Sequence, residues 1–393
     1  MLKASYKLWI YISLTALLLS SCAKVSVGIE TPLSTSEDPS LEAGIETSTP
    51  EPASAQAATV TPEPTLPMPS DPTAGLVFNT AEGLWQIDAS GKPQLLVDQS
   101  TARLSPDGKY AVYARDDEGE GGNDIWLVDL TSGEQRNLTH TPDLFEVGPE
   151  WWPGRPDVVV FGTGNEPGMG NSDLPTLVNQ DGSGYLLLDP AEGGPRAYSP
   201  NGEKFAYNDY DNIGKIYRWG GSPEVFDPAQ YGVSAKSLTF LAWSPDSRYL
   251  TAKVSGDLAQ GGGTSLGFAI FDLETKTSQL LHIYTPAGGG MFPDYLSWSP
   301  DGQWLAFVTY NEPPGGGRQP NLWVSHPDGT DEKFVAAGLN PMWSPDSRHL
   351  AFLNTGSDNR QHLWLAETGT WEPQELMLPV DSMVNFLTGW YTR

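Results

Sequence analysis

Short runs in which apolar and polar residues alternate recur along the chain from residue 75 to residue 393. Examples are residues 110–114, 205–207, 304–308 and 349–353. Alternation with a period of two predicts half-buried β-strands, and Gly, Pro, Asn and Asp bound each run as turn residues do. No long run free of the 42 glycines and 34 prolines shows a helical period. The pattern therefore predicts an all-β fold built from many short strands.

A turn phrase of the form Trp-Ser-Pro-Asp-Gly precedes most of these runs. Near-complete copies begin at Leu104, Tyr198, Trp243, Trp298 and Trp343, and a degenerate copy begins at Trp152. Pro presets φ, Asp bonds back to the backbone, and Gly accepts a positive φ, so the phrase predicts a hairpin turn. The copies are spaced by 45 to 55 residues, which is the length of a four-stranded propeller blade. We name the strands of one repeat a to d, with the phrase between a and b.

The two ends of the repeat region predict how the ring closes. Residues 76–79, 84–88 and 94–97 match strands b, c and d of a repeat without strand a, and residues 386–390 supply the missing strand. This is one-plus-three closure, which removes open sheet edges. Strands b beginning at residues 76, 110, 158, 205, 249, 304 and 349 predict a seven-bladed β-propeller of four-stranded antiparallel blades. Six and eight blades are the alternatives.

These phrases resemble the TolB-type propeller repeat, a relative of the WD repeats, over about residues 75–393. The resemblance implies a β-propeller, although many such domains have six blades. It also implies a role as a sensor or accessory in a cell-envelope assembly, but only by analogy of fold, and a fold does not define a function.

The first residues have the pattern of a bacterial lipoprotein signal. Lys3 and Lys7 precede the apolar residues 8–19, and Leu-Ser-Ser-Cys at residues 19–22 resembles a lipobox. We expect residues 1–21 to be a signal peptide and Cys22, the single cysteine, to carry the lipid. Residues 22–74, rich in Pro, Thr, Ser and Glu, are expected to form a disordered stalk, and residues 75–393 the propeller. The expected location is extracytoplasmic, lipid-anchored in the cell membrane or the outer membrane.

The charge balance narrows the range of partners. The chain has 22 Lys plus Arg against 49 Asp plus Glu, a net charge of −27. Such a field repels phosphate backbones, so no nucleic-acid partner is expected.

The predicted b–c and d–a loops are long and irregular, whereas the phrases and c–d turns are short. In a meander the two kinds of connection lie at opposite ends, so we expect binding on the long-loop face; tolerated insertion is the alternative. The ligand-binding candidates are the polar residues of these loops: Asp116, Asp117, Asn123, Asp124, Glu166, Asn171, Asp173, Asp209, Asp211, Glu312 and Arg318.

Three motifs suggest chemistry, each with a simpler explanation beside it. The oxygen-rich residues 116–124 suggest calcium, but they lack EF-hand spacing, and a solvated acidic loop is commoner. Residues 263–267 fit Gly-x-Ser-x-Gly, but a strand rather than a helix follows. The five histidines show no metal-ligand spacing. We therefore predict no catalytic residues, no metal and no required cofactor.

The sequence favours a membrane-anchored binding or scaffolding lipoprotein that recognises an envelope protein or glycan through the long-loop face. The alternative is an envelope hydrolase or lyase that acts on polysaccharide or peptide in the central funnel, which would need ionisable side chains converging from several blades.

Overall fold

The computed structural model describes residues 71–116, 122–141, 143–164, 174–187, 197–208, 213–258, 264–284, 292–311, 319–356, 358, 360–378 and 383–391. Contacts divide the chain into residues 1–64 and 65–393, and the described residues all fall in the second unit. In the described part, the regular elements are β-strands and one short 3₁₀ helix, η1 (Pro228–Tyr231). The predicted all-β class is confirmed.

Five of the sheets are separate four-stranded antiparallel sheets. The first is β28 (Phe386–Trp390), β1 (Leu76–Thr80), β2 (Gly83–Ile87) and β3 (Pro93–Val97). The next is β12 (Ala197–Tyr198), β13 (Lys204–Asn208), β14 (Gly214–Arg218) and β15 (Glu224–Val225). Then come β16 (Ala235–Trp243), β17 (Tyr249–Gly256), β18 (Ser265–Asp272) and β19 (Thr277–Tyr284). The last two are β20 (Phe292–Trp298), β21 (Leu305–Asn311), β22 (Gln319–Ser325) and β23 (Lys333–Ala337), and β24 (Leu339–Trp343), β25 (His349–Thr355), β26 (Gln361–Glu367) and β27 (Pro373–Leu376).

The remaining strands form one eight-stranded sheet. It contains β4 (Arg103–Leu104), β5 (Tyr110–Asp116), β6 (Asn123–Asp129) and β7 (Gln135–Asn137), followed by β8 (Phe145–Trp152), β9 (Arg155–Gly164), β10 (Leu174–Asn179) and β11 (Leu186–Leu187). A single parallel pairing between Asn123 and Phe145 joins the two antiparallel groups. The expectation of seven separate four-stranded sheets is therefore corrected to five such sheets and one double sheet.

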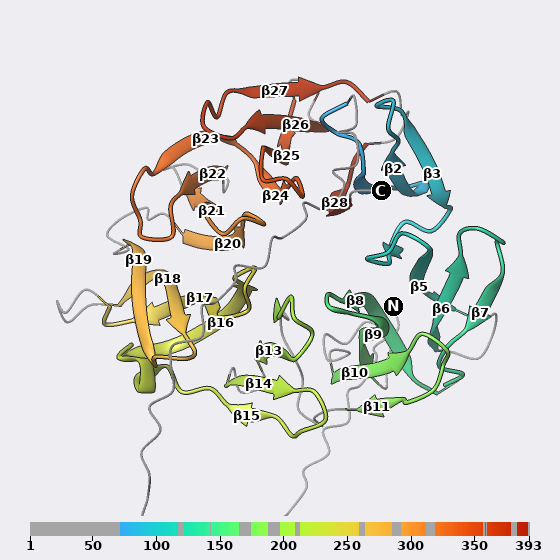
Figure 1. The fold of residues 1–393 in the computed structure, drawn as a ribbon, viewed down its shortest axis with the longest axis horizontal. Coiled ribbons are helices and arrows are strands. Elements are labelled where there is room, and N and C mark those ends of the chain that lie inside the picture. The colour runs from blue at the N-terminus through green and yellow to red at the C-terminus, as the bar shows by residue number, and fades with distance from the viewer. Residues whose placement is uncertain are drawn as a thin grey trace, which may run out of the picture. The chain divides into compact units, whose positions relative to one another are not determined.

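The sheets of this unit follow one another around a common centre, with β8, β16, β20, β24 and β28 toward the inside (Figure 1). Contacts between β24 and β28, and between β28 and β4, carry the ring across the two ends of the unit. Leu76 pairs with Trp390, and the Trp390 indole N–H donates to the carbonyl of Ala74 at 3.0 Å. The predicted one-plus-three closure is confirmed, because the last strand supplies the innermost strand of the first sheet.

The turn phrase works as predicted, with one addition. In the copy at Ser299, the serine Oγ donates to Asp301 Oδ1 at 2.6 Å and accepts from the Trp304 N–H at 2.9 Å. Asp301 also accepts from the Gln303 N–H at 3.0 Å. The Asp of the phrase therefore serves the turn, and the Ser ties the turn to the start of strand b.

Tryptophans before the turns link neighbouring sheets, as expected for large aromatics between blades. The Trp243 indole donates to the carbonyl of Ala197 in the preceding sheet at 2.8 Å. In the degenerate copy, Trp151 makes the corresponding bond to Arg103 at 3.0 Å. Alignment of Trp152 with Trp243 was wrong by one residue, because the register of β8 shifts between Trp151 and Trp152.

Candidate functional site

Three of the predicted ligand-binding residues lie in the described part of the chain. Asp116 is exposed at the end of β5, and Asn123 and Asp124 begin β6, so all three are at the b–c end of the strands. Cys22 and the other candidates lie outside the described residues: Asp117, Glu166, Asn171, Asp173, Asp209, Asp211, Glu312 and Arg318.

The Asp124 carboxylate is buried and occupied by neighbouring donors. It accepts hydrogen bonds from the Thr141 N–H at 2.8 Å, the Thr141 hydroxyl at 3.1 Å and the Asn137 amide at 2.5 Å. Burial by itself raises the pKa of Asp124, but these hydrogen bonds outweigh it and lower the pKa below its ordinary value. Asp124 thus holds the connection between β7 and β8 in place.

Glu146 on β8 lies beside this network and is completely buried. It accepts from the Thr141 hydroxyl at 2.9 Å, the Ile125 N–H at 3.2 Å and the Tyr185 hydroxyl at 3.2 Å. Burial raises the pKa of Glu146 despite these bonds, and the negative charge of Asp124 adds to the effect. Thr141 therefore bridges two carboxylates that join the two halves of the eight-stranded sheet.

This arrangement bears on the calcium hypothesis. The oxygens of Asp124 are committed to protein donors, and no group of three or more His, Cys, Asp or Glu suited to a metal occurs among the described residues. Residues 117–121 lie outside the described part, so the structure does not test calcium binding by residues 116–124, the alternative to the expected solvated acidic loop.

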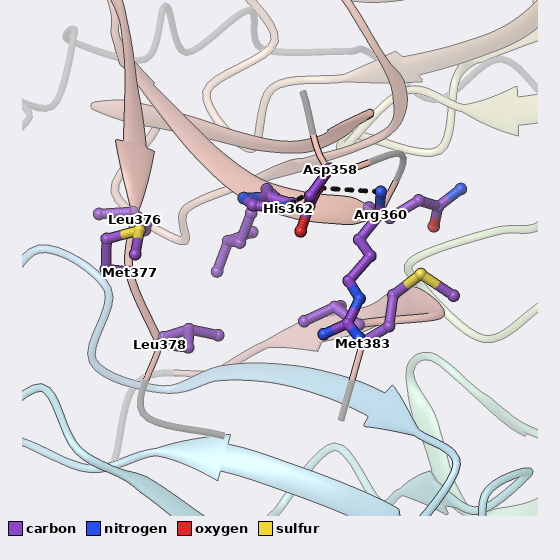
Figure 2. Close-up of a pocket in the computed structure, with 10 residues that line it drawn as sticks. Asp358, Arg360, His362, Leu376, Met377, Leu378 and Met383 are labelled. Atoms are coloured by element: carbon purple, nitrogen blue, oxygen red, sulfur yellow. Dashed lines mark hydrogen bonds and ion pairs between the residues drawn. The ribbon is translucent and has the colours of Figure 1, made fainter. Parts of the chain in front are cut away.

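A cavity of about 240 Å³ opens at the same end of the last sheet, between the β25–β26 loop and the chain that follows β27 (Figure 2). Leu363, Val384, Leu376 and Leu378 form much of its wall, and the first two are buried. The cavity is thus built from b–c and d–a connections, on the face where binding is expected, although none of the eleven predicted ligand-binding residues is among the described residues that line it.

Two methionines give this cavity an exposed apolar rim. Figure 2 shows Met377 and Met383 on opposite sides of the cavity. The exposed fractions are 83% for Met377 and 44% for Met383. Exposed apolar side chains beside a cavity favour ligand contact, and flexible thioethers adapt to varied apolar surfaces. The rim can therefore pack against an apolar side chain of a partner.

His362 lines the cavity between two carboxylates. Its Nε2 lies 2.9 Å from Asp358 Oδ1, and its Nδ1 contacts the Glu375 carboxylate. The pKa of His362 is raised above its ordinary value. The contact with Glu375 is the largest cause, and the contact with Asp358 adds to it. The backbone N–H of Arg360 also donates to Asp358 Oδ1 at 3.0 Å, and this bond orients the Asp358 carboxylate (Figure 2). Arg360 and His362 place two basic groups beside the apolar rim.

A second cavity, of about 320 Å³, adjoins the first. Gln361 lines both, and Pro320, Gly338 and Leu339 bring the neighbouring sheet into the second one. Together the two cavities make a binding region that crosses from the β20–β23 sheet to the β24–β27 sheet.

Strands β4, β8 and β28, which lie toward the inside of the ring, carry a small charged group. The Arg103 guanidinium on β4 lies 4.9 Å from the centre of the Phe386 ring on β28. Burial lowers the pKa of Arg103, and the charge of Glu150 on β8 acts in the opposite direction. The Arg103 guanidinium thus lies over the Phe386 ring and within the electrostatic influence of the Glu150 carboxylate.

The Gly-x-Ser-x-Gly match is not a nucleophile elbow. Ser265 is the first residue of β18 and is 1% exposed, and it pairs with Gly256 of β17. An elbow needs a strand before the serine and a helix after it, whereas here a strand follows.

The sequence did not single out His362, Met377 and Met383. They are separated along the chain, and nothing in their spacing links them. The usable signal was the position of His362 directly after a b–c loop.

In the described part of the chain, no helix has the length and apolar character needed to cross a membrane.

The closed series of antiparallel sheets defines the class of this unit as a β-propeller. The solved structures that it resembles include TolB proteins and other propellers. A putative TolB from Agrobacterium tumefaciens is 19% identical, with a TM-score of 0.42, over 62% of this chain and 84% of that one. TolB from Acinetobacter baumannii is 15% identical, with a TM-score of 0.44, over 78% and 79%.

An oligogalacturonate lyase from Vibrio parahaemolyticus is 13% identical, with a TM-score of 0.48, over 78% of this chain and 80% of that one. No family model and no curated protein matches the sequence. These similarities concern the fold, and no function is transferred from them.

Proposed function

We propose that this chain is a lipid-anchored, extracytoplasmic binding protein that recognises an envelope protein through the long-loop face of its propeller. The observation that carries the proposal is the cavity between Met377 and Met383, built from one b–c and one d–a connection. Its apolar rim favours a protein partner over a glycan, because an exposed apolar side chain gains most from such a wall.

We propose that the propeller has seven blades, two of which are joined in the eight-stranded sheet. The groups β4–β7 and β8–β11 each contain four antiparallel strands, and only the Asn123–Phe145 pairing joins them. Division at that pairing yields seven repeats, with strands b close to all the predicted positions.

The charged group on the innermost strands supplies the observation behind the alternative, an envelope hydrolase or lyase. Glycoside hydrolysis ordinarily uses two carboxyl groups that flank the scissile bond. Arg103 and Glu150 instead contribute one guanidinium and one carboxylate. The charged group therefore favours this alternative less than the Met377 cavity favours binding.

The test is retention of envelope proteins by the full-length protein immobilised in detergent. The double variant Met377→Glu/Met383→Glu puts charge on the rim of the cavity, and we expect it to lose specific partners found with the wild type. Leu95→Glu, at a 48% exposed site on β3, is the matched control and should retain them. If the double variant and the control retain the same proteins as the wild type, the proposed binding face is wrong.

A further inference from the structure

A third cavity, of about 180 Å³, lies at the phrase end of the strands, away from the Met377 cavity. Three basic residues line it: Lys204 at the start of β13, Arg218 at the end of β14, and Lys276 in the turn between β18 and β19. Two neighbouring sheets therefore contribute positive charge to one cavity. In a chain with 22 basic and 49 acidic residues, such a grouping requires an explanation.

Lys204 and Arg218 are direct partners across the β13–β14 ladder. Like charges directly opposite each other destabilise a sheet. Neither side chain forms an ion pair with a described residue, and the Lys204 ammonium lies 5.9 Å from the centre of the Trp243 ring. Burial, followed by the charge of Arg218, lowers the pKa of Lys204, and Lys276 adds to the repulsion, whereas the charges of Glu203 and Glu274 act in the opposite direction. Glu203 and Glu274 therefore offset the repulsion in part, but no described carboxylate forms an ion pair with Lys204 or Arg218.

Lys276 is held in position by Tyr231. Its Nζ donates to the Tyr231 hydroxyl at 2.8 Å and lies 4.8 Å from the ring centre. The Ser278 hydroxyl donates to the Tyr231 carbonyl at 2.7 Å, and the Tyr231 ring stacks on Phe226 at 4.9 Å. The third positive charge is therefore fixed before any ligand arrives, which lowers the entropy cost of binding.

The carboxylates of the cavity do not neutralise it. Glu224 and Asp227 also line it, and Asp227 accepts from the Ala229 N–H at 3.0 Å as the cap of η1. Three cations and two carboxylates thus line the cavity, and Glu203 and Glu274 act on Lys204 from outside the lining; Glu274 also lies 3.5 Å from Arg248.

We propose that this cavity binds a tetrahedral oxyanion, phosphate or sulfate, between Lys204, Arg218 and Lys276. The planar guanidinium binds two oxygens at once, and each ammonium acts as a point charge for another. The oxyanion also removes the repulsion between Lys204 and Arg218. This site does not depend on the function proposed for the long-loop face.

The test is calorimetric titration of the full-length protein with inorganic phosphate, sulfate and acetate at pH 7 and constant ionic strength. We expect phosphate or sulfate to bind more tightly than acetate. Arg218→Gln and Lys204→Gln each should weaken that binding about tenfold, because each removes charge-assisted hydrogen bonds. Lys236→Gln, at an exposed lysine of β16 outside the cavity, removes the same charge and should change affinity less than twofold.

Several results would overturn the proposal. They are acetate binding as tightly as phosphate and sulfate, no binding of either tetrahedral ion above a chloride blank, or an equal loss in Lys236→Gln and Arg218→Gln. The relative affinities of phosphate and sulfate then identify which ion the site prefers. The double variant Met377→Glu/Met383→Glu should bind phosphate like the wild type, so this proposal and the proposed function fail separately.

Discussion

The backbone N–H of Asp301 donates a hydrogen bond to the Oγ of Ser347 at 3.0 Å, and this bond joins the turn phrases of two neighbouring sheets. Asn201 and Ser247 repeat the arrangement at 3.0 Å. Both serines stand where other copies have Gly, and both have φ of 61°. The turn requires a left-handed conformation at this position. Serine supplies the hydrogen bond there, but its Cβ makes that conformation more costly than it is for glycine.

This relationship predicts that Ser347→Ala is less stable than Ser347→Gly. Both variants lose the hydrogen bond, worth about 1 kcal/mol, but only alanine keeps the cost of the left-handed conformation, about 1 kcal/mol. Urea unfolding of the three proteins measures the difference. Equal stability of the two variants would mean that the φ value stores no strain.

We predict that Glu146→Gln is neutral or stabilising at pH 8 and loses that advantage as the pH falls. The pKa of Glu146 is raised in the folded state, so the wild type loses stability as pH rises from the unfolded pKa through the folded one. Gln is isosteric, carries no charge to bury, and can still accept from the Ile125 N–H. Urea unfolding at several pH values from 4 to 8 tests this; a variant less stable than wild type across that range would contradict it.

His362 should also make stability fall as the pH rises, but for a different reason: its carboxylate partners stabilise the charged form of the imidazole in the folded state. Its folded pKa is raised by Glu375 and Asp358, so its contribution is present below the unfolded pKa and is lost as pH rises through the folded pKa. His362→Gln should flatten the stability curve in that window, and Glu375→Gln should lower the pKa of His362. NMR titration of the imidazole gives the pKa directly. A pKa that does not fall in Glu375→Gln would remove the role of that contact.

We predict that Cys22→Ser releases the protein from membranes. A thioether-linked diacylglycerol needs the cysteine sulfur, and serine at residue 22 cannot supply it. Labelling with radioactive palmitate and fractionation of membranes measure attachment and location. A variant that keeps the label, or stays in the membrane fraction as the wild type does, would show that the anchor lies elsewhere.

Much of the fold could be predicted from short stretches of sequence. Strand b of every repeat lies within three residues of its predicted start, from β1 at Leu76 to β25 at His349. The turn phrase explains this accuracy, because Pro, Asp and Gly restrict backbone angles locally. The register of β8 was missed because Trp151 and Trp152 are chemically alike, and only packing against Arg103 distinguishes them.

The candidate site was predictable only as a face. Asp124 looked like a ligand-binding residue, but Thr141 and Asn137 occupy its oxygens. The residues that form the cavity, among them His362 and Met377, carried no local signal.

The sequence by itself determined the all-β class, the turn chemistry and the closure of Leu76 on Trp390, because these depend on backbone angles and on alternation along single strands. Only the tertiary structure decided that Asn123 and Phe145 join two groups of strands, and that Lys204, Arg218 and Lys276 share a cavity. These features depend on how neighbouring sheets pack side by side. That packing is set by contacts between side chains distant in the chain, and no local pattern encodes it.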